Sequence, residues 1–290
     1  MRPWLLAARP RTLPASIAPV LVGTALAVRV GHFQWPVFLA TLLAAVLLQV
    51  GANYANDVFD FLKGADAQRQ GPLRVTQSGL LSPRQMLAGT ALVFVLAALV
   101  GLYLVGVGGV PILMVGALSI LSAVAYTAEP FALAYRGLGD VFAFVFFGLV
   151  AVGGTYYLQT LHLDVLALAV AIPPACLVTN ILVVNNLRDL DTDRAVGKRT
   201  LATRIGDRAS RLQYTALFMV AMGTPAVVWA SGALGPGVMV SWLSLPVGVR
   251  LLRDFWAAPR SAALNPILAR TAQFQLLFCA LFALGIGLAR

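Results

Sequence analysis

The chain has 290 residues, of which 60% are hydrophobic and 11% are charged, and its mean hydropathy is +0.85. Soluble domains carry about 25% charged residues, so this composition excludes a soluble globular protein. The net charge of +10 does not indicate nucleic-acid binding, because the chain has no water-soluble basic domain, and we expect no nucleic-acid partner. The apolar runs do not alternate with polar residues, which excludes a membrane β-barrel and predicts an all-α polytopic membrane protein.

Nine apolar runs have about the length that a helix needs to cross roughly 30 Å of hydrocarbon. The first contains Ala25-Leu26-Ala27 after a basic segment, as a cleaved signal peptide would, but Pro14 and Pro19 interrupt the run and favour a retained helix. Cys176 and Cys279 both fall inside spans, which predicts buried thiols rather than a disulfide. In chain order, the expected spans are 13–30, 36–55, 85–105, 109–127, 139–159, 164–187, 211–231, 236–252 and 270–289.

Charge is distributed very unevenly between the two faces of this arrangement. Of the 21 Lys and Arg residues, 19 fall on the face where the chain begins, and Arg29 and Arg290 are the exceptions. Ten of the 11 acidic residues, all but Asp164, fall on the same face. Positive charge in short loops marks the cytoplasmic side. We therefore expect a multi-pass protein of the cell (inner) membrane, with its N-terminus and polar loops in the cytoplasm and its C-terminus outside.

Two polar clusters lie at the cytoplasmic ends of the second and sixth spans. The first is NYANDVFDFLKGAD at 53–66, and the second is NNLRDLDTDRAVGKRT at 185–200. Helical positions three or four apart share a face. The residues that this rule aligns are Asn53, Asp57 and Asp60 in the first cluster, and Asn185, Asp189 and Asp193 in the second.

The two clusters share a spacing as well as a position. Asn53 and Asn185 are 132 residues apart, and so are Asp57 and Asp189. A duplicated four-helix unit would explain this recurrence. We treat residues 1–290 as a single transmembrane domain that contains the repeat.

Carboxylates on one helical turn repel each other unless a cation lies among them. Mg²⁺ prefers one or two carboxylates and completes its shell with phosphate oxygens and water. A metal held beside Lys and Arg would form a diphosphate clamp, which stabilises a leaving group as it gains charge. Solvated loop residues or an ion or proton pathway are the alternatives, although pathway carboxylates usually lie midway along a span. The nearby cations are Lys63, Arg69 and Arg74, then Arg188, Arg194, Lys198 and Arg199.

Four segments together resemble the UbiA superfamily of membrane prenyltransferases. They are ARPRTLPASIAPVLVGT (8–24), NYANDVFDFLKGAD with the following GPLRVTQSGLLSP, YTAEPFALAYRGLGDVFAFVFFG (126–148) and NNLRDLDTDRAVGKRTLATRIG. The general first motif of the family has an aspartate four residues after Asp60, where this chain has Gly64, and the next acid is Asp66. This longer spacing is similar to the branch that acts on 1,4-dihydroxy-2-naphthoate rather than the 4-hydroxybenzoate enzymes. It leaves the role of Asp66 open.

The resemblance implies nine transmembrane helices around a central cavity, with both aspartate motifs over its cytoplasmic mouth. It also implies Mg²⁺, a polyprenyl diphosphate donor and a naphthoate acceptor, which would give demethylmenaquinol with loss of diphosphate and CO₂. Besides these substrates and membrane lipid, no obligate protein partner is expected. A related enzyme for 4-hydroxybenzoate or homogentisate, an ion or proton transporter, and a quinone-binding scaffold remain the alternatives.

The resemblance and the polar spacing together give each candidate residue a role. The expected metal ligands are Asp57, Asp60, Asp189 and Asp193, assisted by Asn53 and Asn185. The expected diphosphate ligands are Asn53, Lys63, Arg69, Asn185, Arg188 and Lys198. The aromatic candidates for stabilising a carbocation are Tyr126 above all, then Tyr54, Phe142, Phe144, Phe146 and Phe147. Arg9, Arg11 and Arg136 are candidates for the acceptor carboxylate, and Asp140 for a base on an acceptor hydroxyl. Asp191 lies off the helical face of the second motif and has no assigned role.

Overall fold

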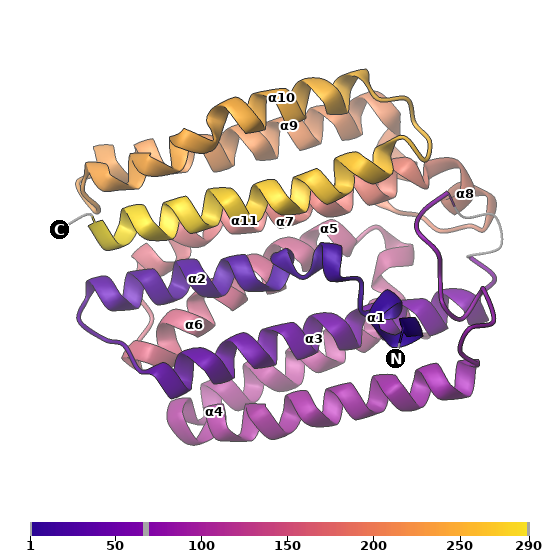
Figure 1. Cartoon of the computed structure of the whole chain (residues 1–290), viewed down its shortest axis with the longest axis horizontal. Helices are drawn as coiled ribbons and strands as arrows, with labels where there is room; N and C mark the ends of the chain where they lie inside the picture. Colours follow the sequence, from indigo (N-terminus) through magenta and orange to yellow (C-terminus); the bar gives the residue numbers. More distant parts are fainter. Residues whose placement is uncertain (1, 66–69, 289–290) are drawn as a thin grey trace.

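The computed structural model describes residues 2–65 and 70–288. Within these ranges the chain is helical and contains no strand, which confirms the expected all-α fold. Figure 1 shows the long helices lying side by side, with α1 and α8 near one end of the bundle and the end of α11 at the other. In chain order the elements are α1 (Arg2–Ala8), η1 (Pro10–Thr12), α2 (Pro14–Arg29), α3 (Trp35–Leu62), α4 (Pro83–Ala125), η2 (Leu133–Arg136), α5 (Gly139–Phe144), η3 (Val145–Val150), α6 (Ala151–Thr160), α7 (Val165–Arg188), α8 (Leu190–Ala195), α9 (Leu201–Ala230), η4 (Pro236–Ser244), α10 (Leu245–Ala257) and α11 (Leu264–Leu288).

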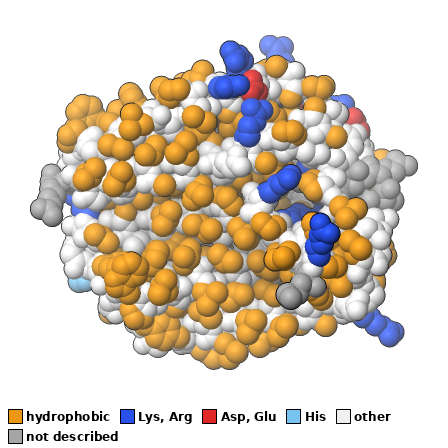
Figure 2. Space-filling model, in the orientation of Figure 1, with side chains coloured by type: hydrophobic (Ala, Val, Ile, Leu, Met, Phe, Trp, Pro, Cys, Tyr) orange, Lys and Arg blue, Asp and Glu red, His pale blue; other side chains and the backbone are white. Residues whose placement is uncertain are grey.

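The number of spans differs from the nine expected. Among the described residues, six helices are long and apolar enough to cross a membrane, and the pair formed by α1–η1 and α2, bent by 52°, is a seventh candidate. The face of the bundle in Figure 2 is largely apolar, and the Lys and Arg side chains visible on it lie mostly towards the end that holds α8. The chain is therefore an integral membrane protein, as expected.

The third and fourth expected spans form one element, α4, which has 43 residues. A straight helix of that length would extend about 65 Å, roughly twice the thickness of the hydrocarbon layer. The backbone breaks at Gly109, where φ is 68° and ψ is −155°, and Pro111 follows at the start of the second arm. Glycine adopts positive φ at little cost, and proline suits the first turn of a helix. The expected division near residue 107 is thus a sharp break within α4, whose two arms pack beside α3 (Figure 1).

The eighth expected span, 236–252, is divided between η4 and α10. The first part winds as a 3₁₀-helix up to Ser244, and only 13 residues remain for α10. This is why the segment is missing from the six candidate spans, although α10 lies beside α9 and close to α11 (Figure 1). The expectation of a single regular helix here is wrong.

The two motifs that the sequence aligned on helical faces are positioned differently. The first lies on the last turns of α3, which continues to Leu62, so Asn53, Asp57 and Asp60 do share one helix. The second is interrupted, because α7 ends at Arg188 and Asp189 has non-helical backbone angles. Asp193 then comes from the separate helix α8. The expectation of one continuous helical face for the second motif is therefore wrong.

The helix α7 lies at the centre of the packing and fixes the position of the second motif. It contacts α9, α11, α2, η3 and α5, and much of its length is buried. Its closest neighbour is Gly148 of η3, where a Cβ atom would come within 2.1 Å of Ala175 Cβ. Such close approach through small residues is typical of helix packing in membranes. Cys176 and Cys279 are buried free thiols, as expected.

Candidate active site

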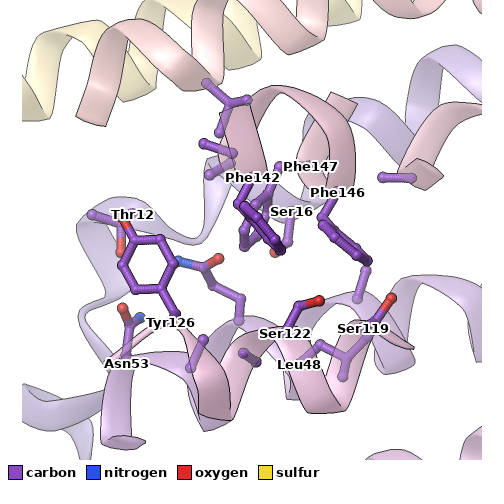
Figure 3. A pocket seen from close by; sticks show the side chains of 18 of the residues that line it. Thr12, Ser16, Leu48, Asn53, Ser119, Ser122, Tyr126, Phe142, Phe146 and Phe147 are labelled. Atoms are coloured by element: carbon purple, nitrogen blue, oxygen red, sulfur yellow. The ribbon is translucent and has the colours of Figure 1, made fainter. Parts of the chain in front are cut away.

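A cavity of about 910 Å³ extends through the bundle between α2, α3, both arms of α4, the segment 139–160, α7 and α11. One end is polar and the rest is mostly apolar (Figure 3). The polar end is lined by residues that include Asn53, Asn56, Asp60, Arg74, Asn185, Asn186, Arg188 and Lys198, with Arg9 and Arg11 also in the lining. The apolar lining includes Leu48, Leu104, Ile120, Phe142, Phe146, Phe147 and Leu158. The cavity therefore joins a site for a charged group to a long apolar volume.

The two aspartates of the first motif are both buried but make different contacts. Asp57 accepts hydrogen bonds from two backbone amides of the following loop, Val75 N at 3.1 Å and Thr76 N at 2.9 Å. Asp60 accepts a hydrogen bond from Arg74 Nη2 at 2.7 Å. Asp57 thus fixes the loop that brings Arg74 to Asp60, and of the two aspartates Asp60 lines the cavity.

The second motif is organised around the buried side chain of Arg188. Its guanidinium donates from Nε to Asp189 Oδ1 at 2.8 Å and from Nη2 to Asp189 Oδ2 at 2.5 Å. It also donates to Asn185 Oδ1 and to Asn265 Oδ1, both at 2.9 Å. Bidentate arginine–carboxylate pairs are strong and fixed in direction. The sequence prediction therefore placed Arg188, Asp189 and Asn185 correctly in one cluster and missed Asn265, which comes from α11.

Asp193 reaches the same region from α8. Its carboxylate lies 3.5 Å from Lys198 Nζ, and its backbone carbonyl accepts a hydrogen bond from Lys198 N at 2.8 Å. Burial raises the pKa of Asp193 to about 6, against the lowering effect of Lys198, and the carboxylates of Asp189 and Asp60 raise it further. Asp60 of the first motif and Asn185, Arg188 and Lys198 of the second line the same polar end of the cavity, so the two motifs face each other there.

Tyr135, in the loop between α4 and α5, connects the two motifs and was missed from the sequence. Its hydroxyl donates to Asp60 Oδ1 at 2.9 Å, and its backbone carbonyl accepts from Arg199 N at 3.1 Å. Lys63 Nζ lies 4.1 Å from the centre of its ring, and Lys198 Nζ lies 5.2 Å from it. Ammonium groups are attracted to the faces of aromatic rings. The residue stands inside the quoted stretch 126–148, but no spacing rule indicated which tyrosine would reach the site.

The polar end of the cavity offers oxygen atoms that suit Mg²⁺. Within residues 2–65 and 70–288, no three His, Cys, Asp or Glu side chains are arranged to hold a metal ion by themselves. Mg²⁺ needs one or two carboxylates, with phosphate oxygens and water completing its shell. The oxygen donors of Asp60, Asp189 and Asp193, each already beside a cation, fit that chemistry for an ion that arrives with a phosphate ligand. The expected ligand set of four aspartates and two asparagines stays a prediction.

The remaining residues of the expected clamp have varied environments. Asn53 lines the cavity and donates from Nδ2 to Ala8 O at 2.9 Å. Lys63 forms an ion pair with Glu129 at 2.7 Å. Asp191 is exposed and pairs with Arg260 at 2.7 Å, away from the cavity lining. The predictions for Asp66 and Arg69 fall outside the described residues.

The candidates for the acceptor and the carbocation divide into those that line the cavity and those that do not. Tyr126, Arg9, Arg11, Phe142, Phe146 and Phe147 line it, and the rings of Phe142 and Phe146 stack at 5.7 Å between centroids with an interplanar angle of 15°. Arg136 is exposed and donates to Pro130 O at 2.7 Å. Asp140 is buried at the start of α5, Tyr54 donates to Trp4 O, and Phe144 packs into the main core. Among the described residues that line the cavity, Arg136, Asp140, Tyr54 and Phe144 are not found.

Comparison with known proteins places this geometry in a family. The chain is 39% identical over 273 residues to 1,4-dihydroxy-2-naphthoate octaprenyltransferase of Mycobacterium leprae, which covers 92% of this chain and 90% of the relative. It is 38% identical over 297 residues to 1,4-dihydroxy-2-naphthoate octaprenyltransferase of Escherichia coli, covering 99% and 96%.

The same bundle occurs in solved structures of low sequence identity. A UbiA homologue from Aeropyrum pernix matches with a TM-score of 0.72 at 17% identity, covering 93% of this chain and 96% of that one. A UbiA homologue from Archaeoglobus fulgidus, bound to GPP and Mg²⁺, matches with a TM-score of 0.67 at 14% identity, covering 97% and 99%. Residues 16–272 also match the UbiA prenyltransferase family as a whole. On its sequence, its fold and its paired aspartate motifs, the chain belongs to the UbiA prenyltransferase family.

Proposed function

We propose that this protein transfers a polyprenyl group from a polyprenyl diphosphate to 1,4-dihydroxy-2-naphthoate, with loss of diphosphate and CO₂, to give demethylmenaquinol. The observation that carries the proposal is a cavity that joins a charged mouth to an aromatic-lined apolar body. Asp60, Arg74, Arg188 and Lys198 line this mouth. The relatives from M. leprae and E. coli, which bear the name of this activity, support the same acceptor.

The polar end binds the diphosphate of the donor. Arg74, Arg188 and Lys198 line the cavity and carry the positive charge that phosphate oxygens need. Asp60, Asp189 and Asp193 lie beside them and would hold Mg²⁺, which would neutralise charge on the leaving diphosphate. Asp57 contributes to diphosphate binding indirectly, because it fixes the loop that carries Arg74.

The chemical step begins when the bond between the first prenyl carbon and the diphosphate oxygen breaks. The electron pair leaves with the diphosphate, and an allylic carbocation remains, which must be kept from water. The rings of Tyr126, Phe142, Phe146 and Phe147 line the cavity below the polar end and present faces that stabilise a cation. The apolar body beyond them holds the hydrocarbon chain of the donor.

The acceptor completes the reaction without needing a base. The naphthoate ring carbon that bears the carboxylate attacks the cation and forms the new carbon–carbon bond. The carboxylate then leaves as CO₂, and its electron pair restores the aromatic ring, so no proton has to be removed from the ring. This agrees with the position of Asp140, which is buried at the start of α5 and is not among the described cavity-lining residues. A role for Asp140 as a base is therefore not part of the proposal.

The mouth of the cavity faces the cytoplasm, and the membrane is the cell (inner) membrane. The distribution of Lys and Arg supports this orientation, because 19 of 21 fall on the face that carries the two motifs. The N-terminus is then cytoplasmic and the C-terminus external. Both substrates enter this site from the membrane or from its cytoplasmic surface.

The purified protein in lipid nanodiscs tests the proposal. With Mg²⁺ and a polyprenyl diphosphate, we expect a prenylated naphthol product by mass spectrometry and stoichiometric release of labelled CO₂ from carboxyl-labelled 1,4-dihydroxy-2-naphthoate. Equal concentrations of 4-hydroxybenzoate and of homogentisate serve as competing acceptors. Preferential prenylation of either one would replace the naphthoate assignment, and ion flux in proteoliposomes without any prenylated product would replace the enzyme with a transporter. Binding of a quinone without turnover would indicate a scaffold.

A further inference from the structure

Gln49 is a buried amide in the cavity wall that the proposed chemistry has not used. It lies on α3, is 8% exposed and lines the cavity. Within the described part of the chain, its Oε1 has no hydrogen-bond partner. A side-chain amide can accept through its oxygen and donate twice through its nitrogen, and leaving a buried polar atom unpaired is unfavourable. A polar ligand in the cavity would relieve that cost.

Five other polar side chains along the cavity already donate their hydrogen bonds within the protein. The hydroxyls of four of them donate to a backbone carbonyl three or four residues earlier, so their hydrogen atoms are already used. These bonds are Thr12 to Arg9 O at 3.0 Å, Ser16 to Leu13 O at 3.0 Å, Thr41 to Val37 O at 2.7 Å and Thr155 to Ala151 O at 2.6 Å. Asn53 likewise donates to Ala8 O. Gln49, by contrast, is a buried amide of this wall with an unpaired atom, which makes it available to an external partner.

The position of Gln49 along α3 excludes the donor substrate as that partner. It is four residues from Asn53 and 11 residues from Asp60, which correspond to about 6 Å and about 16 Å along the helix axis. A diphosphate held by Asp60, Arg74 and Arg188 does not extend that far. The prenyl chain reaches the level of Gln49 but has no hydrogen-bonding atoms. The remaining substrate is the aromatic acceptor.

The surroundings of this wall suit a flat aromatic molecule. Figure 3 shows Phe142, Phe146 and Phe147 on one side of the cavity and Leu48, Ser119 and Ser122 on the other. Leu48 precedes Gln49 on α3. Stacked rings such as Phe142 and Phe146 offer an apolar surface to a planar bicyclic ring, which packs against aromatic neighbours favourably.

We propose that Gln49 recognises the acceptor, with its side-chain amide forming a hydrogen bond with a phenolic hydroxyl while the ring packs against Phe142 and Phe146. This inference rests on the proposed function, because it concerns the second substrate of the same cavity. Arg136 and Asp140 were expected from the sequence to contact the acceptor, but neither is among the described residues that line the cavity. Gln49 lines the cavity and takes over that role. Gln49 is a substrate-binding and specificity-determining residue.

The first test separates the two substrates kinetically. Gln49→Met removes the amide and keeps the length of the side chain. We expect its KM for 1,4-dihydroxy-2-naphthoate to rise about tenfold, as a lost hydrogen bond implies, with the KM for the polyprenyl diphosphate unchanged. The matched control is Gln275→Met: Gln275 is 0% exposed, both of its amide atoms lack partners among the described residues, and it is not among the residues that line the cavity. The control should leave both KM values unchanged.

The second test identifies which hydroxyl of the acceptor Gln49 binds, by using ligands that each lack one hydroxyl. Dissociation constants are measured by quenching of tryptophan fluorescence for 1,4-dihydroxy-2-naphthoate, 1-hydroxy-2-naphthoate and 4-hydroxy-2-naphthoate, in the wild type and in Gln49→Met. For the analogue that lacks the hydroxyl bound by Gln49, wild type and variant should bind equally. For the other two ligands the variant should bind about tenfold more weakly.

The outcomes distinguish this inference from the proposed function. An equal loss of affinity for all three naphthoates, or a change in the KM of the donor alone, overturns the role of Gln49. If the wild type prenylates 4-hydroxybenzoate instead, the naphthoate assignment fails, and the same two tests are repeated with 4-hydroxybenzoate and benzoate. Thermal unfolding checks that Gln49→Met is folded; if it is not, Gln49→Leu takes its place, and unchanged acceptor affinity in that variant also overturns the proposal.

Discussion

Asp57 and Asp60 lie one turn apart on α3 and serve different purposes. The carboxylate of Asp57 accepts two backbone N–H groups of the loop after α3, so Asp57→Asn would place an N–H donor against another donor. We expect faster hydrogen exchange in peptides that cover residues 72–80, together with a weaker affinity for the donor. Hydrogen–deuterium exchange by mass spectrometry measures the first effect.

Asp191→Asn is the matched control for this change, because Asp191 is an exposed aspartate paired with Arg260 rather than with a backbone amide. Exposed ion pairs contribute little to stability. The control should leave exchange in residues 72–80 as it is in the wild type. Unchanged exchange in Asp57→Asn as well would contradict a role for Asp57 in fixing the loop.

Tyr135 offers a test of how the two motifs are held together. Tyr135→Phe removes the hydroxyl that donates to Asp60 and keeps the ring near Lys63 and Lys198. Hydrogen bonds to charged groups contribute about 1.5–3 kcal/mol, so we expect the KM for the polyprenyl diphosphate to rise about tenfold or more, with the KM for the acceptor unchanged. Steady-state kinetics with each substrate varied in turn gives both values.

Tyr157→Phe is the corresponding control, since that hydroxyl donates to Gly108 O at 3.1 Å, beside the break in α4. It should leave both KM values as in the wild type. Tyr135→Leu, which also removes the ring, should have a larger effect than Tyr135→Phe. If Tyr135→Phe behaves like Tyr157→Phe, the hydroxyl of Tyr135 does not position Asp60.

At the scale of whole elements, the close approach of η3 and α7 determines where the second motif lies. A Cβ atom at Gly148 would lie 2.1 Å from Ala175 Cβ and 2.5 Å from Ala175 Cα, and a backbone atom cannot move aside as a side-chain tip can. Gly148→Ala should therefore push the two helices apart and destabilise the protein by about 1–3 kcal/mol, the usual range for overpacking. Thermal unfolding in detergent measures the shift.

Gly223 of α9 is the comparison for this change, because a Cβ atom there would meet nothing within 4 Å. Gly223→Ala should unfold at the wild-type temperature or slightly above it, as alanine favours a helix more than glycine does. A wild-type unfolding temperature for Gly148→Ala would show that the contact with Ala175 is not tight.

The sequence predicted most of the helices because a long apolar run has few alternatives in a membrane. What it did not predict are the local breaks. Gly109 and the 3₁₀ winding of η4 depend on backbone angles, and hydropathy is insensitive to them. The break at Asp189 likewise depends on how the chain after α7 packs, so spacing alone gave a continuous helix. The internal four-helix repeat remains a prediction based on the spacing of 132 residues.

The candidate site was predictable where it depends on residues close in sequence. Arg188, Asp189 and Asn185 are close together along the chain, and helical periodicity brings them into one cluster. Tyr135 and Asn265 come from distant segments and meet the motifs only through the fold. Gln49 is different again, since it is one turn from Asn53, but its significance lies in its burial and its unpaired oxygen, which a sequence does not express.

At the scale of the whole molecule, the orientation in the membrane can be tested directly. The native cysteines are buried, so a single introduced cysteine reports its own side of the membrane. His32→Cys and Ala195→Cys occupy exposed positions at opposite ends of the bundle. In spheroplasts, a membrane-impermeant maleimide should label the cysteine at position 32 and not that at 195, and in inverted vesicles the pattern should reverse. Labelling in the opposite sense would place the two motifs outside the cell.

The mouth of the cavity is already neutralised by its own side chains, since Asp60 pairs with Arg74, Asp189 with Arg188 and Asp193 with Lys198. Free Mg²⁺ would have to compete with these cations for the carboxylates, and a free diphosphate would have to compete with the carboxylates for the cations. An ion and an anion that arrive together can exchange partners with each pair, and the charge that they bring is largely cancelled between them. Metal and diphosphate should therefore each raise the affinity of the protein for the other by the same factor. By the same reasoning, we expect the resting protein to bind Mg²⁺ alone or inorganic phosphate alone only weakly, and to bind both tightly when a donor brings the two charges together.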